Sequence, residues 1–173
     1  MTDPYSQANE LLDVVNINDC VVGQATRGEI HEKGLLHRAS HVFLFNSTGN
    51  IYVQRRSQWK DRHPLKLDSS AAGHVDTGET YFEAAERELH EELGIRPGLV
   101  AALSVLACPK TDNEHVVLFE AHSDLPPIPN QDEILEGVFM DPTQLSHLMR
   151  KDPDDFVPAF VLLWDLYMKS RSK

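Results

Sequence analysis

The fold is decided by the stretch GHVDTGETYFEAAERELHEELGI, which spans residues 73–95. It carries six acidic side chains between Glu79 and Glu92, and small or turn-forming residues gather at its start. Its apolar residues recur at the spacing of one helical face, at Phe82, Ala85, Leu89 and Leu93. We therefore expect an amphipathic helix that starts near Thr80 and ends at Gly94.

Three carboxylates of this helix, those of Glu88, Glu91 and Glu92, share one face because residues three and four apart are neighbours. Their mutual repulsion costs roughly a few tenths of a kcal/mol per pair, and acids in the last turn oppose the helix dipole. One explanation is a solvent-exposed acidic face on which Arg87 reduces the repulsion between the carboxylates. The glycine loop that starts at Gly73 favours another, because glycine lets backbone carbonyls approach a divalent cation bound against the helix.

The composition of this 173-residue chain is that of one globular domain, and its net charge of −11 argues against a nucleic-acid polymer as partner. A small phosphorylated molecule remains compatible when a metal ion mediates the contact. We expect neither a signal peptide, since the start lacks a basic and apolar run, nor a membrane-spanning segment. The two cysteines lack metal-ligand spacing and fit reduced thiols in the cytoplasm.

The rest of the chain reads as hairpins with a few helices, which predicts an α+β fold with a mixed sheet and helices on its faces. Residues 10–26 form an expected β-hairpin around an Asn-Ile-Asn-Asp turn. We divide the chain into an N-terminal hairpin extension, residues 1–34, and a main domain with C-terminal helices, residues 35–173. The extension also offers an exchange surface for a homodimer.

Residues 73–95 meet every position of the signature G-x(5)-E-x(7)-R-E-U-x-E-E-x-G-U, in which U is a bulky aliphatic residue. The matching residues are Gly73, Glu79, Arg87, Glu88, Leu89, Glu91, Glu92, Gly94 and Ile95. The chain therefore resembles the Nudix superfamily, and its strand order over roughly residues 35–141 is similar too. The resemblance implies an αβα sandwich and Mg²⁺- or Mn²⁺-dependent hydrolysis of a pyrophosphate linkage in a nucleoside diphosphate derivative or related nucleotide.

The same resemblance implies roles for the signature residues. Glu88 and Glu92 become the principal metal ligands, and the carbonyl of Gly73 completes the site. Glu91 becomes a further ligand or the base that activates water. The metal ion then neutralises the diphosphate and lowers the pKa of its bound water, while a carboxylate accepts the proton.

Two further features follow from the resemblance. Glu79 and Arg87 become a structural salt bridge that holds the loop against the helix. Glu133 lies in the late loop where some family members keep an additional catalytic carboxylate, so we include it among the catalytic candidates.

A closer resemblance concerns residues 35–60, LLHRASHVFLFNSTGNIYVQRRSQWK, which are similar to the isopentenyl-diphosphate isomerase branch of the superfamily. Those enzymes use a cysteine directly before a glycine–histidine pair, where this chain has Ala72. Cys108 lies on a different expected strand. We therefore favour a hydrolase over an isopentenyl-diphosphate delta-isomerase. A catalytically idle nucleotide-binding domain is the third reading, which the intact signature disfavours.

The histidine pattern of the isomerase branch is partly present. His37 and His74 match two of its metal-binding histidines, His31 lies close to a third, and Glu114 falls near its glutamate. The sequence leaves open whether these residues bind a second metal or are hydrogen-bonded side chains.

A basic cluster precedes the glycine loop, where it could clamp phosphate oxygens. It comprises Arg55, Arg56, Lys60, Arg62, His63 and Lys66. Strand alternation turns only one of the two adjacent arginines inward, and we select Arg55, Lys60 and His74 as substrate-binding residues. Trp59 could stack a base or serve in packing.

Overall fold

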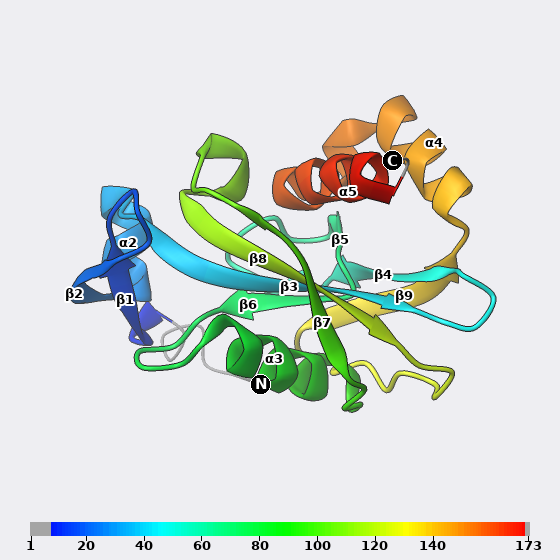
Figure 1. Cartoon of the computed structure of the whole chain (residues 1–173), viewed down its shortest axis with the longest axis horizontal. Coiled ribbons are helices and arrows are strands. Elements are labelled where there is room, and N and C mark those ends of the chain that lie inside the picture. The colour runs from blue at the N-terminus through cyan, green and yellow to red at the C-terminus, as the bar shows by residue number, and fades with distance from the viewer. Residues whose placement is uncertain (1–7, 172–173) are drawn as a thin grey trace.

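The computed structural model describes residues 8–171, so residues 1–7 of the expected extension and residues 172–173 lie outside the described part. Helix α3 covers one face of the central sheet, and α4 and α5 cover the other (Figure 1). The helices are α2 (Arg27–Lys33), α3 (Tyr81–Leu93), α4 (Pro142–Lys151) and α5 (Pro158–Arg171). None of them is long and apolar enough to cross a bilayer. The layers confirm the expected α+β, αβα architecture.

The central sheet is mixed and has seven strands. Its main path runs β5–β4–β3–β8–β7, while β6 pairs with β3 and β9 pairs with β4. The strands are β3 (His37–Phe45), β4 (Ile51–Arg56), β5 (Leu67–Asp68), β6 (Ala71–His74), β7 (Leu99–Val105), β8 (Glu114–His122) and β9 (Ile134–Met140). Strands β1 (Leu11–Val15) and β2 (Val21–Thr26) form the expected N-terminal hairpin, which lies with α2 at one end of the sheet (Figure 1). Two 3₁₀ turns, η1 (Pro109–Thr111) and η2 (Pro153–Asp155), complete the described elements.

The position of β3 in the middle of the sheet fixes several residues at once. It runs parallel to β8, with His37 opposite Glu114. It runs antiparallel to β6, with Ala39 opposite His74. Residues that are distant in sequence are therefore brought to one end of the sheet by strand register alone.

Both faces of β3 are buried, as expected for a strand covered by helices on two sides. Phe43 and Phe45 belong to the core beneath α4 and α5. Val42 and Leu44 belong to the core beneath α3. The period-2 alternation of side chains thus divides one apolar run between two cores.

Helix α3 has defined ends, which explains why the sequence signals for it were strong. Thr80 and Glu83 form a capping box at its start, and Gly94 ends it in the left-handed conformation with φ 69°. The buried stripe begins later in the helix than expected, because Phe82 is 43% exposed. Ala84 lies in the buried face instead.

Aromatic rings of helix α5 pack into the core that lies beneath α4 and α5. Phe160 is fully buried, and its ring lies 5.6 Å from that of Phe43 and 6.2 Å from that of Phe156. Phe160→Ala should therefore lower the free energy of unfolding by about 3–5 kcal/mol, because it removes a large buried ring. Leu166→Ala, at a partly exposed position of the same helix, should cost at most about 1 kcal/mol. Urea denaturation of both variants measures the difference, and equal losses would contradict this packing.

Candidate active site

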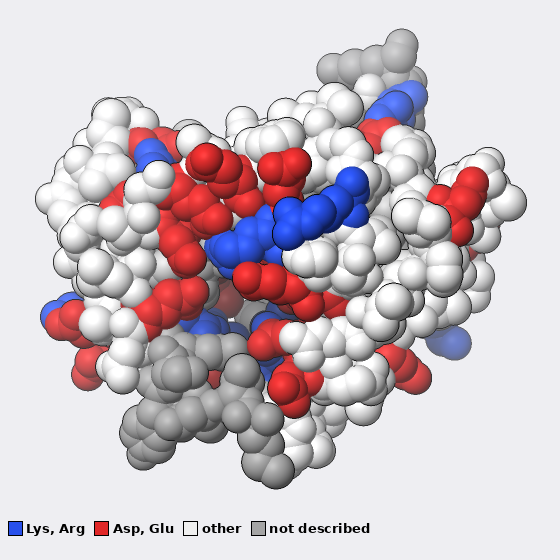
Figure 2. Space-filling view, turned by 90° about the horizontal axis from the view of Figure 1, so that it is seen from below, with Lys and Arg blue, Asp and Glu red and all other residues white. Residues whose placement is uncertain are grey.

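A polar pocket of about 450 Å³ opens on the face of the molecule that carries α3. Acidic side chains gather on this face with basic side chains among them (Figure 2). The signature residues Gly73, Glu88, Glu91 and Glu92 all line the pocket. So do residues from the N-terminal segment, the loop between β4 and β5, and the loop before β8.

Gly73 and Glu88 fit each other closely. The carboxylate of Glu88 lies directly over the α-carbon of Gly73, so that a β-carbon on Gly73 would collide with it. Only glycine allows this approach. Burial raises the pKa of Glu88, although Arg87 opposes the shift. A carboxylate held in this way against a backbone segment is suited to bind a cation.

Arg87 ties the glycine loop to the helix. Its guanidinium donates to both oxygens of Glu79, each at 2.9 Å, and to the carbonyl oxygen of His74 at 3.0 Å. It also donates to Glu88 at 2.6 Å. The Glu79–Arg87 salt bridge is thus formed, and the same arginine orients the carboxylate that covers Gly73.

Glu92 is the most deeply buried carboxylate of the helix, with 2% of its surface exposed. Its Oε2 accepts from the side-chain amide of Gln54 at 2.9 Å and from the backbone of Ala72 at 3.4 Å. Burial raises its pKa to about 7, with Lys60 opposing and Glu88 adding to the shift. A buried carboxylate next to a half-buried one that repels it is costly unless a positive charge lies nearby.

Glu91 lies at the rim of the pocket. Its side chain is 57% exposed. Among the described residues, its one ion pair is with Arg87, whose Nη1 lies 3.5 Å from Oε2 of Glu91. Lys60 and Glu133 lie deeper and form an ion pair with each other. Ser57 fastens the two loops that carry them, because its hydroxyl donates to the carbonyl oxygen of Asp132 at 2.7 Å.

Arg55 does not line the pocket, so the structure gives no support to its selection as a substrate-binding residue. It pairs with Asp155 and Glu136 and donates to the carbonyl oxygen of Leu65. Its neighbour Arg56 lines the pocket and pairs with Asp68 at 2.9 Å. Alternation along β4 places Arg55 on the side of α5 and Arg56 on the side of the site.

Trp59 is 73% exposed and does not line the pocket. Its indole is therefore not placed to stack a base there.

Three histidines cluster beside another wall of the pocket, which His31 and His74 line. The potential ligand atoms of His31, His37 and His74 lie within 4.8 Å of one another. Glu114 lies 3.5 Å from Nε2 of His37 and 3.3 Å from Nε2 of His74. His74 therefore lies within this cluster and at the pocket, close to Glu10 as well.

The hydrogen bonds of the cluster leave nitrogen atoms facing one another. His37 uses Nδ1 on the carbonyl oxygen of Leu35, and its Nε2 is buried without a hydrogen bond among the described residues. Nε2 of His31 is buried in the same way. Burial lowers the pKa of His31 to about 4, whereas hydrogen bonds to Glu10 and Glu114 outweigh burial and raise the pKa of His74 to about 9.

The two sets of ligands differ in chemistry. The oxygen atoms of Glu88, Glu92 and the Gly73 backbone suit Mg²⁺ or Mn²⁺. The imidazoles of His31, His37 and His74, with the half-buried carboxylate of Glu114 beside them, suit a borderline divalent ion such as Zn²⁺, Mn²⁺ or Fe²⁺. Both sets fit a bound cation. In the histidine set, Nε2 of His31 and Nε2 of His37 are buried without a hydrogen bond among the described residues. In the carboxylate set, Glu88 and Glu92 repel each other.

Comparison with known proteins decides the family. The model of the NUDIX domain matches residues 35–160 of the chain. The chain belongs to the Nudix family. A Nudix hydrolase of Nostoc sp., all7351, is 38% identical over 146 residues, which cover 82% of this chain and 86% of the relative.

Two further similarities bear on the subgroup. The isopentenyl-diphosphate Delta-isomerase 2 of Photorhabdus laumondii is 31% identical over 157 residues, which cover 88% of this chain and 89% of that protein. The crystal structure of DR0079 from Deinococcus radiodurans superposes with a TM-score of 0.73 at 35% identity and covers 82% of this chain and 90% of that one. The Nudix relatives and the fold support a hydrolase of phosphorus-containing anhydrides.

Several residues of this Nudix pocket were missed by the sequence reasoning. They are Glu10, Arg27, Gln54, Asp68 and Asp112, with Arg56, Arg62 and His63 recognised only as members of the basic cluster. The N-terminal extension supplies Glu10, Arg27 and His31, so it forms a wall of the site. Alternation in IYVQRR was the available signal for Gln54 and Arg56, which share a face two residues apart.

The contact between Gly73 and Glu88 can be tested with a matched pair of variants. Gly73→Ala should displace the Glu88 carboxylate and weaken Mg²⁺ binding by about tenfold or more. Gly98→Ala, where nothing lies within 4 Å of an added β-carbon, should leave Mg²⁺ binding unchanged. Calorimetric titration with MgCl₂ measures both, and unchanged affinity in Gly73→Ala would contradict the role of this contact.

Proposed function

We propose that the protein is a Mg²⁺-dependent hydrolase that cleaves a pyrophosphate linkage. The observation that carries the proposal is the buried carboxylate of Glu92 next to the half-buried carboxylate of Glu88, which repels it and lies against Gly73. The intact signature and the hydrolases among the relatives support it. An idle binding domain would gain nothing from burying both carboxylates at such a cost.

Glu88, Glu92 and the carbonyl oxygen of Gly73 would hold the ion, with Glu91 as a further ligand at the rim. When bound, Mg²⁺ supplies charge neutralisation of the diphosphate and acidifies a coordinated water. Arg87 keeps Glu88 in place, and Gln54 keeps Glu92 in place through its amide. The arrangement is therefore fixed before the substrate arrives, which is what efficient charge stabilisation requires.

Cationic side chains that line the same pocket would receive the phosphate oxygens. Arg27, Arg56 and Lys60 all line it, and each is anchored by a carboxylate. A guanidinium carries five N–H donors, so the pair with Asp68 leaves Arg56 donors for a phosphate. These residues replace Arg55 in the substrate-binding role expected from sequence.

The proton of the attacking water requires an acceptor. Glu91 and Glu133 line the pocket without being needed as principal ligands, and both stay candidates for the base. Comparison of Glu91→Gln with Glu133→Gln separates them, because the base variant loses turnover while it retains Mg²⁺ affinity.

A hydrolase is favoured over an isomerase by the residue before Gly73. Ala72 lines the pocket where the isomerase branch carries its cysteine. Neither Cys20 nor Cys108 lines the pocket. Without a thiol there, the carbon acid–base pair of the isomerase is incomplete, although Glu114 is present in the site.

Glu92→Gln should lower Mg²⁺-dependent phosphate release by about 100-fold or more, because a lost ligand costs at least as much as a lost outer contact. Glu86→Gln, an exposed glutamate of the same helix, should stay within about twofold of the wild type. A screen of nucleoside diphosphates and triphosphates, sugar nucleotides, dinucleotides and prenyl diphosphates supplies the substrate. Full activity in Glu92→Gln would remove the proposed metal site.

The isomerase alternative has its own test. Incubation of the protein and MgCl₂ with isopentenyl diphosphate should yield no dimethylallyl diphosphate, because no thiol lines the pocket. Chromatography of the prenyl products decides the outcome. Steady formation of dimethylallyl diphosphate would show that the reaction proceeds without that cysteine and would overturn the preference for hydrolysis.

A further inference from the structure

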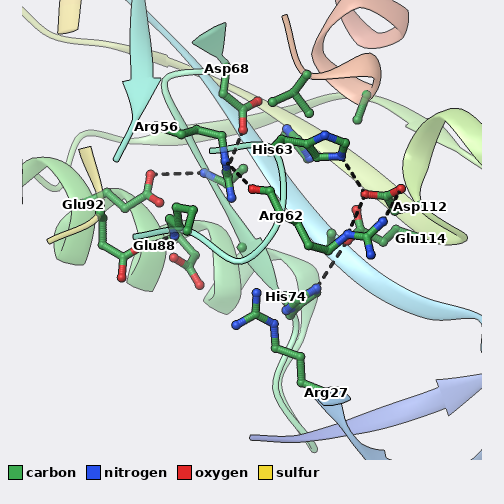
Figure 3. A pocket seen from close by; sticks show the side chains of 18 of the residues that line it. Arg27, Arg56, Arg62, His63, Asp68, His74, Glu88, Glu92, Asp112 and Glu114 are labelled. Carbon is green, nitrogen blue, oxygen red and sulfur yellow. Dashed lines mark hydrogen bonds and ion pairs between the residues drawn. The ribbon is translucent and has the colours of Figure 1, made fainter. Parts of the chain in front are cut away.

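One group of pocket residues is not used by the proposed chemistry. Arg62 and His63, from the loop between β4 and β5, are both directed at Asp112, which precedes β8 (Figure 3). This group lies on the side of the pocket away from Glu88 and Glu92 (Figure 3). All three of its side chains line the pocket.

Asp112 holds Arg62 by one edge of the guanidinium. Nε of Arg62 lies 3.1 Å from Oδ2 of Asp112, and Nη2 lies 2.8 Å from Oδ1. Asp112 also accepts from His63 at 2.9 Å, and the hydrogen bonds from His63 and Arg62 lower the pKa of its carboxyl to about 2. Within residues 8–171, no acceptor is bonded to Nη1 of Arg62. The guanidinium is therefore fixed, and it keeps N–H donors for a ligand.

The backbone around this contact is strained. Five non-glycine residues of the described chain have positive φ, and four of them lie here: His63, Leu65, Asp112 and Asn113. Such conformations cost about 1–3 kcal/mol each and concentrate at ligand clamps and active sites. The two loops that meet at the Arg62–Asp112 contact both contain positive-φ residues. The geometry of this contact is therefore maintained despite a cost in backbone conformational energy.

The lining of the pocket also limits what can lie beside Arg62. Its apolar members are small, namely Ala39, Ala72, Val157 and Ala159, and it contains no Phe, Tyr or Trp. Recognition of a nucleobase usually relies on stacking against a flat side chain. The flat groups of the lining are histidine and arginine side chains, and at this end the nitrogen atoms of Arg62 and His63 are bonded to Asp112.

We propose that the organic part of the substrate is non-aromatic and carries a second anionic group, a phosphate or a carboxylate, which Arg62 binds. A fixed, charged fork of N–H donors matches such a group through paired, charge-assisted hydrogen bonds. This inference rests on the proposed diphosphate hydrolysis and narrows its substrate. The diphosphate lies at Glu88 and Glu92, and the second anion lies at the far end of the same pocket.

Three Mg²⁺-complexed diphosphates test the inference by calorimetry on the full chain. 5-Phosphoribosyl 1-diphosphate has a second phosphate, isopentenyl diphosphate has a neutral tail, and ADP has an aromatic one. 5-Phosphoribosyl 1-diphosphate should bind about tenfold or more tightly than the other two ligands, because one charge-assisted hydrogen bond contributes about that much to affinity. Arg62→Ala should abolish this preference, because it should weaken the binding of 5-phosphoribosyl 1-diphosphate and leave the affinity for the other two ligands unchanged. Where turnover occurs, KM should rise and kcat should stay within about twofold.

Arg55→Ala is the matched control, because it removes an ion-paired arginine of the same strand and loop region outside the pocket. It should keep the ligand preference. Equal weakening of all three ligands in Arg62→Ala would show that Arg62 only fastens the loop and would overturn the inference. Equal affinity of the wild type for the three ligands would overturn it as well. Loss of hydrolysis with the preference intact would refute the proposed function instead.

Discussion

The contact between the carboxylate of Glu88 and the backbone of Gly73 constrains much of this structure. It requires a glycine at that position, and it requires α3 to lie against β6. Arg87 then joins the loop and the helix through Glu79, Glu88 and a backbone carbonyl. With Glu92 buried beside this arrangement, negative charge is concentrated where water is largely excluded. This concentration of negative charge supports the proposal that the site holds a divalent cation.

The sheet provides the second half of the pocket. Parallel pairing of β3 with β8 and antiparallel pairing of β3 with β6 bring His37, His74 and Glu114 together. The N-terminal segment then adds His31 and Arg27 from α2. The pocket thus combines a group of carboxylates, a group of histidines and several ion-paired cationic side chains. Such a combination suits a small, multiply charged substrate better than a large apolar one.

Sequence signals predicted correctly those features that depend on residues close together in the chain. The capping box at Thr80, the glycine at 94 and the helical period predicted α3, and the signature residues all come from one loop and the helix that follows. Alternation along β4 predicted that only one of Arg55 and Arg56 faces the site, but β4 is covered on both faces, so alternation alone could not decide which of the two lines the pocket. Asp112 and Arg27 were missed because only tertiary pairing, with Arg62 and Asp61, brings them to the pocket. No period or motif in the sequence marks such contacts.

The most direct measurement is a crystal of the wild-type protein soaked in MnCl₂, with data collected at a wavelength that gives strong manganese anomalous scattering. The account predicts an anomalous peak within coordinating distance of the Glu88 and Glu92 carboxylates and the carbonyl oxygen of Gly73, at about 2.0–2.6 Å, the range of hard cations on oxygen ligands. Absence of a peak there at saturating manganese, with both carboxylates still ordered, would contradict it.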